Sequence, residues 1–219
     1  LEYAIDKQAI VDTRGYGWYE VVNQFAPPTS PSYAQNIVTR GYDPEKARQL
    51  LADAGYPNGF QTRLICDSGS TDRDAMTAIQ GYLSEVGIDA DVNFADFATY
   101  LGFRRDGWSN AILVGAVGFD ANLNNSFARY WSQDAAWYPS MIKSDEFEVL
   151  YDASRTAADY EPEMVMAMNR YIAENALIMP MYAITRGAIL QEWVYDAGFY
   201  TKQTWPGWEP ANLWLGDKD

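Results

Sequence analysis

The chain has 219 residues with 30 acidic and 16 basic side chains, and its formal net charge of −14 argues against binding nucleic acid or an anionic membrane surface. It has no histidine, which excludes Ser-His-Asp and Cys-His catalysis and any histidine-liganded metal within this sequence. The single cysteine, Cys66, cannot form an internal disulfide, and no apolar run approaches the roughly 20 residues that a membrane-spanning helix needs.

The first quarter of the chain combines helical patterns with one irregular segment. Apolar residues at helical spacing run from residue 1 to residue 11, and this start inside a pattern leads us to expect a piece of a longer protein. Residues 13–42 hold three prolines among several aromatic residues, which predicts an irregular, packed loop. Asp43 and Pro44 then predict the cap and first residue of a helix that ends near Gly55.

Strands and helices are then expected to alternate. The predicted elements are a strand over 61–65, a helix capped by Ser70 or Thr71 and ended by Gly87, a strand over 88–94, a helix from Asp96 to about Arg105, and a strand over 111–117 that is buried on both faces. This β-α-β-α-β order with short connections predicts an α/β fold with a mostly parallel sheet covered by helices.

The second half of the chain has a less regular pattern. Residues 120–143 are rich in Asn and aromatic side chains and predict a loop, and two helices are expected at about 145–157 and 161–175. An apolar strand over 176–184 is interrupted by Pro180, which favours an edge strand or a bulge. Residues 186–195 are compatible with one further strand.

The predicted sheet points to one candidate binding site. Ligands of open α/β sheets bind beyond the carboxyl ends of the strands. The central strand runs into Phe119 and Asp120, whose carboxylate can pair with an ammonium group, and the amides of Asn122 and Asn124 can add hydrogen bonds. The alternative is that Asp120 only closes a turn, as Asp side chains commonly do.

A function of a different class is also open at this point. Eight tryptophans and numerous carboxylates are compatible with a carbohydrate-active enzyme, or with a sugar-binding module that stacks sugar rings on Trp. The enzyme would need two carboxyl groups about 5–10 Å apart in one cleft.

Three stretches of the sequence resemble one protein family. They are LEYAIDKQAIVD at residues 1–12, the Pro27-Pro28 loop, and YDPEKARQLLADAGYPNGF at residues 42–60. The chain is therefore similar to the family 5 extracellular solute-binding proteins, the peptide receptors of ABC importers. The matching segments correspond to the C-terminal half of such receptors.

This resemblance implies a function and an arrangement in the whole protein. Residues 1–192 would form the second, periplasmic-binding-protein-like lobe of a two-lobed receptor, and residues 193–219 a tail that returns to the first lobe. The receptor would capture a peptide-like or other small solute between its lobes and deliver it to a membrane permease, without catalysis, cofactor or bound metal. It would work in the periplasm or as a lipid-anchored protein outside the cell.

The resemblance also concerns the candidate site. Peptide-binding relatives have an Asp after the central strand that pairs with the ligand ammonium, followed seven residues later by a Phe, and Asp120 and Phe127 stand in this relation here. An aromatic residue is usual three residues before that Asp, where this chain has Val117. We therefore expect Val117 to line a reshaped pocket together with Phe119, Asp120, Asn122 and Asn124.

Overall fold

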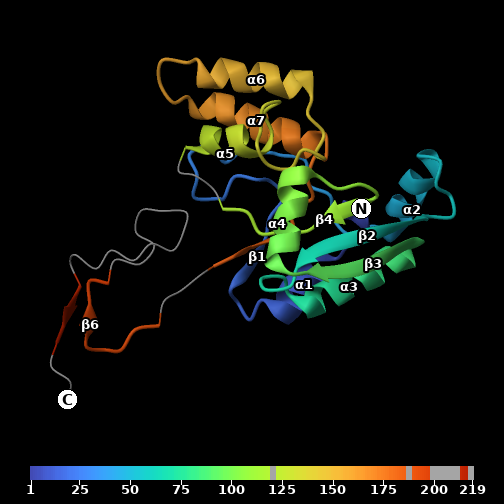
Figure 1. Cartoon of the computed structure of the whole chain (residues 1–219), viewed down its shortest axis with the longest axis horizontal. Coiled ribbons are helices and arrows are strands. Elements are labelled where there is room, and N and C mark those ends of the chain that lie inside the picture. The colour runs from blue at the N-terminus through green and yellow to red at the C-terminus, as the bar shows by residue number, and fades with distance from the viewer. Residues whose placement is uncertain (119–121, 186–188, 198–212, 217–219) are drawn as a thin grey trace.

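The computed structural model describes residues 1–118, 122–185, 189–197 and 213–216. Its centre is a parallel sheet with the strand order β3-β2-β4 (Figure 1). Strand β2 (Phe60–Asp67) pairs with β3 (Ile88–Ala95) along its whole length and with β4 (Ala111–Leu113) over its middle residues 63–65. The predicted α/β fold with a mostly parallel sheet is confirmed.

Helices cover both faces of this sheet. Helix α3 (Arg73–Glu85) connects β2 to β3, and its apolar side chains pack on Leu64, Cys66 and Ile88. Helix α4 (Phe97–Asp106) connects β3 to β4 on the opposite face, where Tyr100 packs on Ile65 and Ala95. Alternate residues of β2 thus enter two separate cores, as the period of a strand requires.

The predicted strand over 111–117 is wrong in length and in burial. Strand β4 ends at Leu113, and residues 115–117 are exposed. Gly115 and Ala116 offer little apolar surface to bury. The carbonyl of Val114, which a longer ladder would use, instead accepts a hydrogen bond from the Tyr100 hydroxyl at 3.0 Å.

The N-terminal elements and α2 pack against the α3 side of the sheet. They are a 3-10 helix, η1 (Glu2–Ala4), then α1 (Lys7–Arg14) and α2 (Pro44–Asp53). Asp43 caps α2 by accepting from Lys46 N, and Asp96 caps α4, both as predicted. Helix α3 is capped by Asp72 rather than by Ser70 or Thr71, because Asp67 draws those two residues into a turn.

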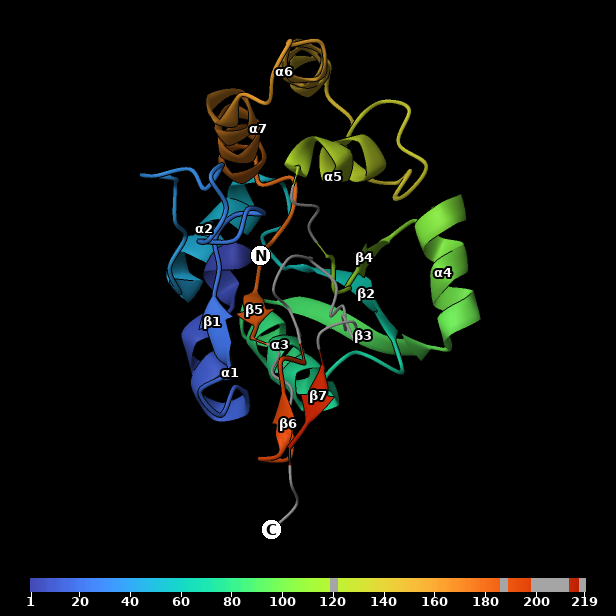
Figure 2. The ribbon, with the colours of Figure 1, turned by 90° about the vertical axis from the view of Figure 1, so that its left-hand side faces the viewer.

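Three helices form a separate layer beside the sheet (Figure 2). Helices α6 (Asp145–Arg155) and α7 (Pro162–Glu174) lie where two helices were predicted. Helix α5 (Leu123–Tyr130) contradicts the predicted loop over 120–143. Its apolar residues follow a helical period, and Phe127 is fully buried against Phe147 of α6.

A short antiparallel ladder joins distant parts of the chain. Strand β1 (Tyr19–Val21), inside the predicted loop, pairs with β5 (Tyr182–Ile184), which is shorter than the predicted strand over 176–184. Near the C-terminus, β6 (Val194–Tyr195) and β7 (Trp214–Leu215) form a two-stranded hairpin that extends away from the body (Figure 1). Within the described ranges, no helix is long and apolar enough to cross a membrane.

Candidate functional site

The three parallel strands end at one edge of the sheet, which we call the carboxyl edge. The ends are Asp67 of β2, Ala95 of β3 and Leu113 of β4. A helix begins shortly after each strand, and its cap is Asp72, Asp96 or Asn122. The carboxyl edge therefore carries three polar connections side by side, in the place where open α/β sheets bind ligands.

The first connection is closed by Asp67, which sequence analysis did not single out. Its side chain is buried and accepts hydrogen bonds from Gly69 N at 3.1 Å and from the Ser70 hydroxyl at 2.6 Å. Ser68 N donates to the carbonyl of Ala95 at 2.8 Å and ties this turn to the end of β3. Asp67 thus shapes the edge, and both of its carboxylate oxygens already have donors.

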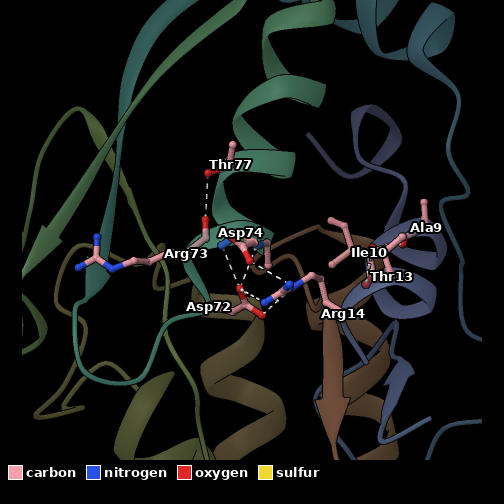
Figure 3. A network of polar contacts seen from close by, with 9 residues as sticks. Ala9, Ile10, Thr13, Arg14, Asp72, Arg73, Asp74 and Thr77 are labelled. Atoms are coloured by element: carbon pink, nitrogen blue, oxygen red, sulfur yellow. Dashed lines mark hydrogen bonds and ion pairs between the residues drawn. The ribbon is translucent and has the colours of Figure 1, made fainter. Parts of the chain in front are cut away.

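An ion-pair network lies beside this turn (Figure 3). Arg14, the last residue of α1, contacts Asp72 with Nε at 3.1 Å and Asp74 with Nη1 at 2.9 Å. Burial acts to raise the pKa of Asp72, but the amides of Asp74 and Ala75 and the guanidinium of Arg14 hold it below its ordinary value. The network joins the end of α1 to the start of α3.

The same residues line an open hollow. Its volume is about 550 Å³, and it is lined by Arg14 and residues 69–74. It holds two carboxylates, but both are paired with Arg14, so neither is available as a free acid and base pair. Among the described residues, no cluster of Cys, Asp and Glu side chains is suited to hold a metal ion.

The third connection carries the predicted binding residues. It leaves the sheet at Val114, whose amide donates to the Ile65 carbonyl at 2.9 Å, and reaches Val117, which is 38% exposed. Phe119 and Asp120 lie outside the described residues, so their predicted roles stay predictions. The segment resumes at Asn122, the cap of α5.

The structure gives both predicted asparagines contacts that hold α5. Asn122 Oδ1 accepts from Asn124 N at 3.0 Å, and Asn124 Oδ1 accepts from the Ser154 hydroxyl at 2.9 Å. Ligand binding by the side-chain amides of Asn122 and Asn124 stays a prediction. Phe127 packs inside the helical layer, with no exposed surface.

Sequence analysis also missed Tyr100 and Arg14. Tyr100 reads as one apolar member of a short helix, and Arg14 as a cation at a helix end. A glycine in an apolar strand pattern, Gly115, was an available signal, since such a glycine often marks a close approach of another group.

Comparison with known proteins decides the family. The family description "Bacterial extracellular solute-binding proteins, family 5 Middle" matches residues 1–138. The chain belongs to this family. Its members are transport receptors rather than enzymes, so the carbohydrate-active enzyme considered above is set aside.

The chain is similar to several family 5 proteins. It is 27% identical to heme-binding protein A of Haemophilus influenzae over 91% of this chain and 40% of that protein. It is 41% identical to the glutathione-binding protein GsiB of Escherichia coli K12 over 44% of this chain and 19% of that protein. The chain thus spans less than half the length of these relatives.

Solved structures agree with the fold. The periplasmic binding protein DppA of Helicobacter pylori, in complex with the peptide STSA, matches 84% of this chain and 38% of its own at 25% identity, with a TM-score of 0.71. A dipeptide-binding protein of Pseudoalteromonas, in complex with Met-Leu, matches 98% of this chain and 44% of its own at 19% identity, with a TM-score of 0.79.

Proposed function

We propose that this chain is the second lobe of a two-lobed receptor that captures a peptide-like or other small solute for an ABC importer, with Asp120 binding a cationic group of the solute. The observation that carries the proposal is the connection between β4 and α5. The chain leaves the carboxyl edge at Val114, and the described residues resume at Asn122, the cap of α5. Ligands of open α/β sheets bind beyond this edge, which supports a binding role for the connection. The relatives with bound peptides support the class of ligand.

The mechanism proposed for the whole receptor is closure of two lobes around the solute. A solute that touches both lobes stabilises the closed form, because only that form makes both sets of contacts. The closed form would then be recognised by the permease in the membrane. This action belongs outside the cytoplasmic membrane, in the periplasm or on a lipid anchor, in keeping with a family of extracellular solute-binding proteins.

The exposed apolar surface supports a division of the chain at about residue 192. Tyr195 stacks on Trp214 with ring centres 4.2 Å apart, and Leu215 next to Trp214 is 65% exposed. An isolated two-stranded hairpin is marginally stable in water. We therefore propose that residues 193–219 pack on the first lobe, and that residues 1–192 form the second.

The test is ligand capture by the full-length receptor. Native mass spectrometry identifies the solute that co-purifies, and calorimetry with that solute then compares Asp120→Ala with the wild type. Loss of a buried charge pair should weaken binding by about 2–5 kcal/mol. The control is Asp53→Ala, an exposed acid at the end of α2.

Two outcomes would count against the proposal. Unchanged affinity in Asp120→Ala, with Asp53→Ala also unchanged, would remove Asp120 from the site. A co-purified sugar without a cationic group would favour the sugar-binding alternative, in which tryptophan rings rather than Asp120 hold the ligand.

A further inference from the structure

Tyr100 contacts the backbone at the point where the chain leaves the sheet toward Asp120. The ladder of β4 ends with the hydrogen bond from Val114 N to the Ile65 carbonyl. The next bond along the chain runs from the Tyr100 hydroxyl to the Val114 carbonyl, at 3.0 Å. Both backbone polar groups of Val114 are therefore held, its amide by β2 and its carbonyl by α4.

The hydroxyl of Tyr100 is itself held in a fixed position. Tyr100 is 4% exposed and packs on Ile65 and Ala95, and α4 is anchored at its start by the Asp96 cap. The last turn of α4 is tied to the helical layer, because the Arg104 carbonyl accepts from Tyr138 N at 2.7 Å. A buried phenol needs a hydrogen-bond partner, and the Val114 carbonyl is that partner.

The residue after Val114 fits this contact. A Cβ atom on Gly115 would overlap the Tyr100 hydroxyl oxygen, whereas it would lie 3.4 Å from the ring carbon that carries this oxygen. Glycine is thus the residue that lets the hydroxyl reach the backbone. Tyr100 and Gly115 form one contact from opposite sides.

We propose that Tyr100 is a positioning residue for ligand binding: its hydroxyl fixes Val114, where the segment that leads to Asp120 leaves the sheet. This inference rests on the proposed role of Asp120 in that segment. After Asp120, the described chain resumes at Asn122, which caps α5. Leu123 and Phe127 of this helix are both fully buried. Without the hydroxyl, Val114 keeps the hydrogen bond from its amide to the Ile65 carbonyl and loses the one that its own carbonyl accepts.

The first experiment measures the contact without any ligand, by hydrogen exchange of the full-length receptor. Tyr100→Phe keeps the ring and removes only the hydroxyl, so exchange of the Val114 amide should become about fivefold faster, the value of one hydrogen bond. Amides in the β2–β3 ladder should keep their rates. The control is Tyr160→Phe, which removes a hydroxyl that bonds Ser32 Oγ at 2.6 Å.

A double-mutant cycle tests the overlap at Gly115. Gly115→Ala should lower the unfolding midpoint, because the new methyl group meets the hydroxyl oxygen. Adding Tyr100→Phe removes that oxygen, so the double variant should recover part of the loss. If the effects of the two substitutions on the unfolding midpoint are simply additive, the hydroxyl and the added methyl group do not meet, and the contact does not exist.

The third experiment connects the contact to function. The readout is the fraction of protein that retains the co-purified solute in native mass spectra as the sample is diluted. Tyr100→Phe should bind the solute about three- to tenfold more weakly than wild type and therefore lose it at a correspondingly higher protein concentration. Tyr160→Phe should retain it like wild type. Unchanged retention together with faster exchange at Val114 would overturn the positioning role.

The failures of the two proposals are distinguishable. Faster exchange at Val114 in Tyr100→Phe, with unchanged binding in Asp120→Ala, would leave the contact in place and reject Asp120 as the ligand anchor. Unchanged exchange in Tyr100→Phe would reject the contact, whatever Asp120 does.

Discussion

The two edges of the parallel sheet differ in structure: the amino edge is closely packed, and the carboxyl edge carries polar connections. At the amino edge, where β2 and β3 begin, Gly59 and Gly87 have positive φ angles of +73° and +90°, and their backbones touch, so a Cβ atom on Gly59 would overlap the Gly87 carbonyl. Gly59 lies within the run of residues 42–60, one of the three stretches that carry the family resemblance. At the carboxyl edge, the connections carry polar side chains and exposed backbone.

The difference teaches what a family signature reports. The run over 42–60 caps α2, ends it and contacts the end of α3, where Tyr42 and Arg48 each donate a hydrogen bond to Glu85. These contacts are requirements of the fold. The proposed ligand contacts lie at the other edge, where Val117 departs from the family pattern. A strong signature at the amino edge therefore identifies the family and says little about the solute.

The largest effect should come from breaking the glycine contact. Gly59→Ala places a methyl group into the Gly87 carbonyl at a positive φ angle, and we expect a loss of about 3–5 kcal/mol in the free energy of unfolding. Gly55→Ala is the matched control, because Gly55 has φ +90° but nothing within 4 Å of an added Cβ atom; it should cost about 1–2 kcal/mol. Urea unfolding of the full-length receptor measures both. Equal losses would mean that φ alone, without close packing, explains the two glycines.

The next effect compares a helix cap at each edge. Asp72→Ala removes the cap of α3 and the partner of Arg14 together, with an expected loss of about 2–3 kcal/mol, whereas Asp43→Ala removes only the cap of α2 and should cost about 1 kcal/mol.

The Asp72 contribution should also depend on pH in a definite direction. The pKa of this carboxyl is lowered in the folded protein. Its contribution is therefore complete above the ordinary Asp value of about 3.9 and is lost as the pH falls through the lower, folded value. Acid unfolding of Asp72→Ala should consequently show a weaker pH dependence than wild type. An identical pH dependence would contradict the proposed charge contacts.

The last prediction concerns the middle of the sheet, between the two edges, and is measured as a labelling rate. Burial raises the pKa of the Cys66 thiol to about 11, so the thiol stays protonated at pH 8. Alkylation by iodoacetamide at pH 8 should be at least about 100-fold slower in the folded than in the unfolded protein. Comparable rates would show that the sheet opens readily. Faster labelling in Gly59→Ala would show that damage at the amino edge reaches the centre.

The sequence predicted those parts of the fold that rest on local rules. Asp43 and Asp96 were predicted as caps because a short acceptor before a helical pattern has few other uses, and β3 was predicted from the strict alternation of residues 88–94. Parallel pairing followed from the β-α-β order, since two strands joined through a helix must run in the same direction.

The errors fall where a tertiary contact decides the outcome. Strand β4 ends early because Tyr100, more than ten positions away, takes the Val114 carbonyl. Asp72 replaces Ser70 as the cap because Asp67 binds the Ser70 hydroxyl. Helix α5 was overlooked because three asparagines suggested a loop, although Asn122 is its cap and Leu123 and Phe127 have helical spacing. The position of Tyr100 beside the candidate site depends on packing that no local pattern contains.

The segment from Val114 to Asn122 begins in the sheet and ends in the helical layer. Any change in the spacing between these two layers therefore moves Val114 relative to Asn122, the hydrogen-bonded backbone positions before and after Asp120. The hydrogen bond from Ser154 of α6 to Asn124 of α5 helps to set the position of α5 in the helical layer. If Asp120 binds the solute as proposed, substitutions in the α5–α6 contact should change the affinity without any direct contact to the solute, while the packing at the amino edge keeps the fold.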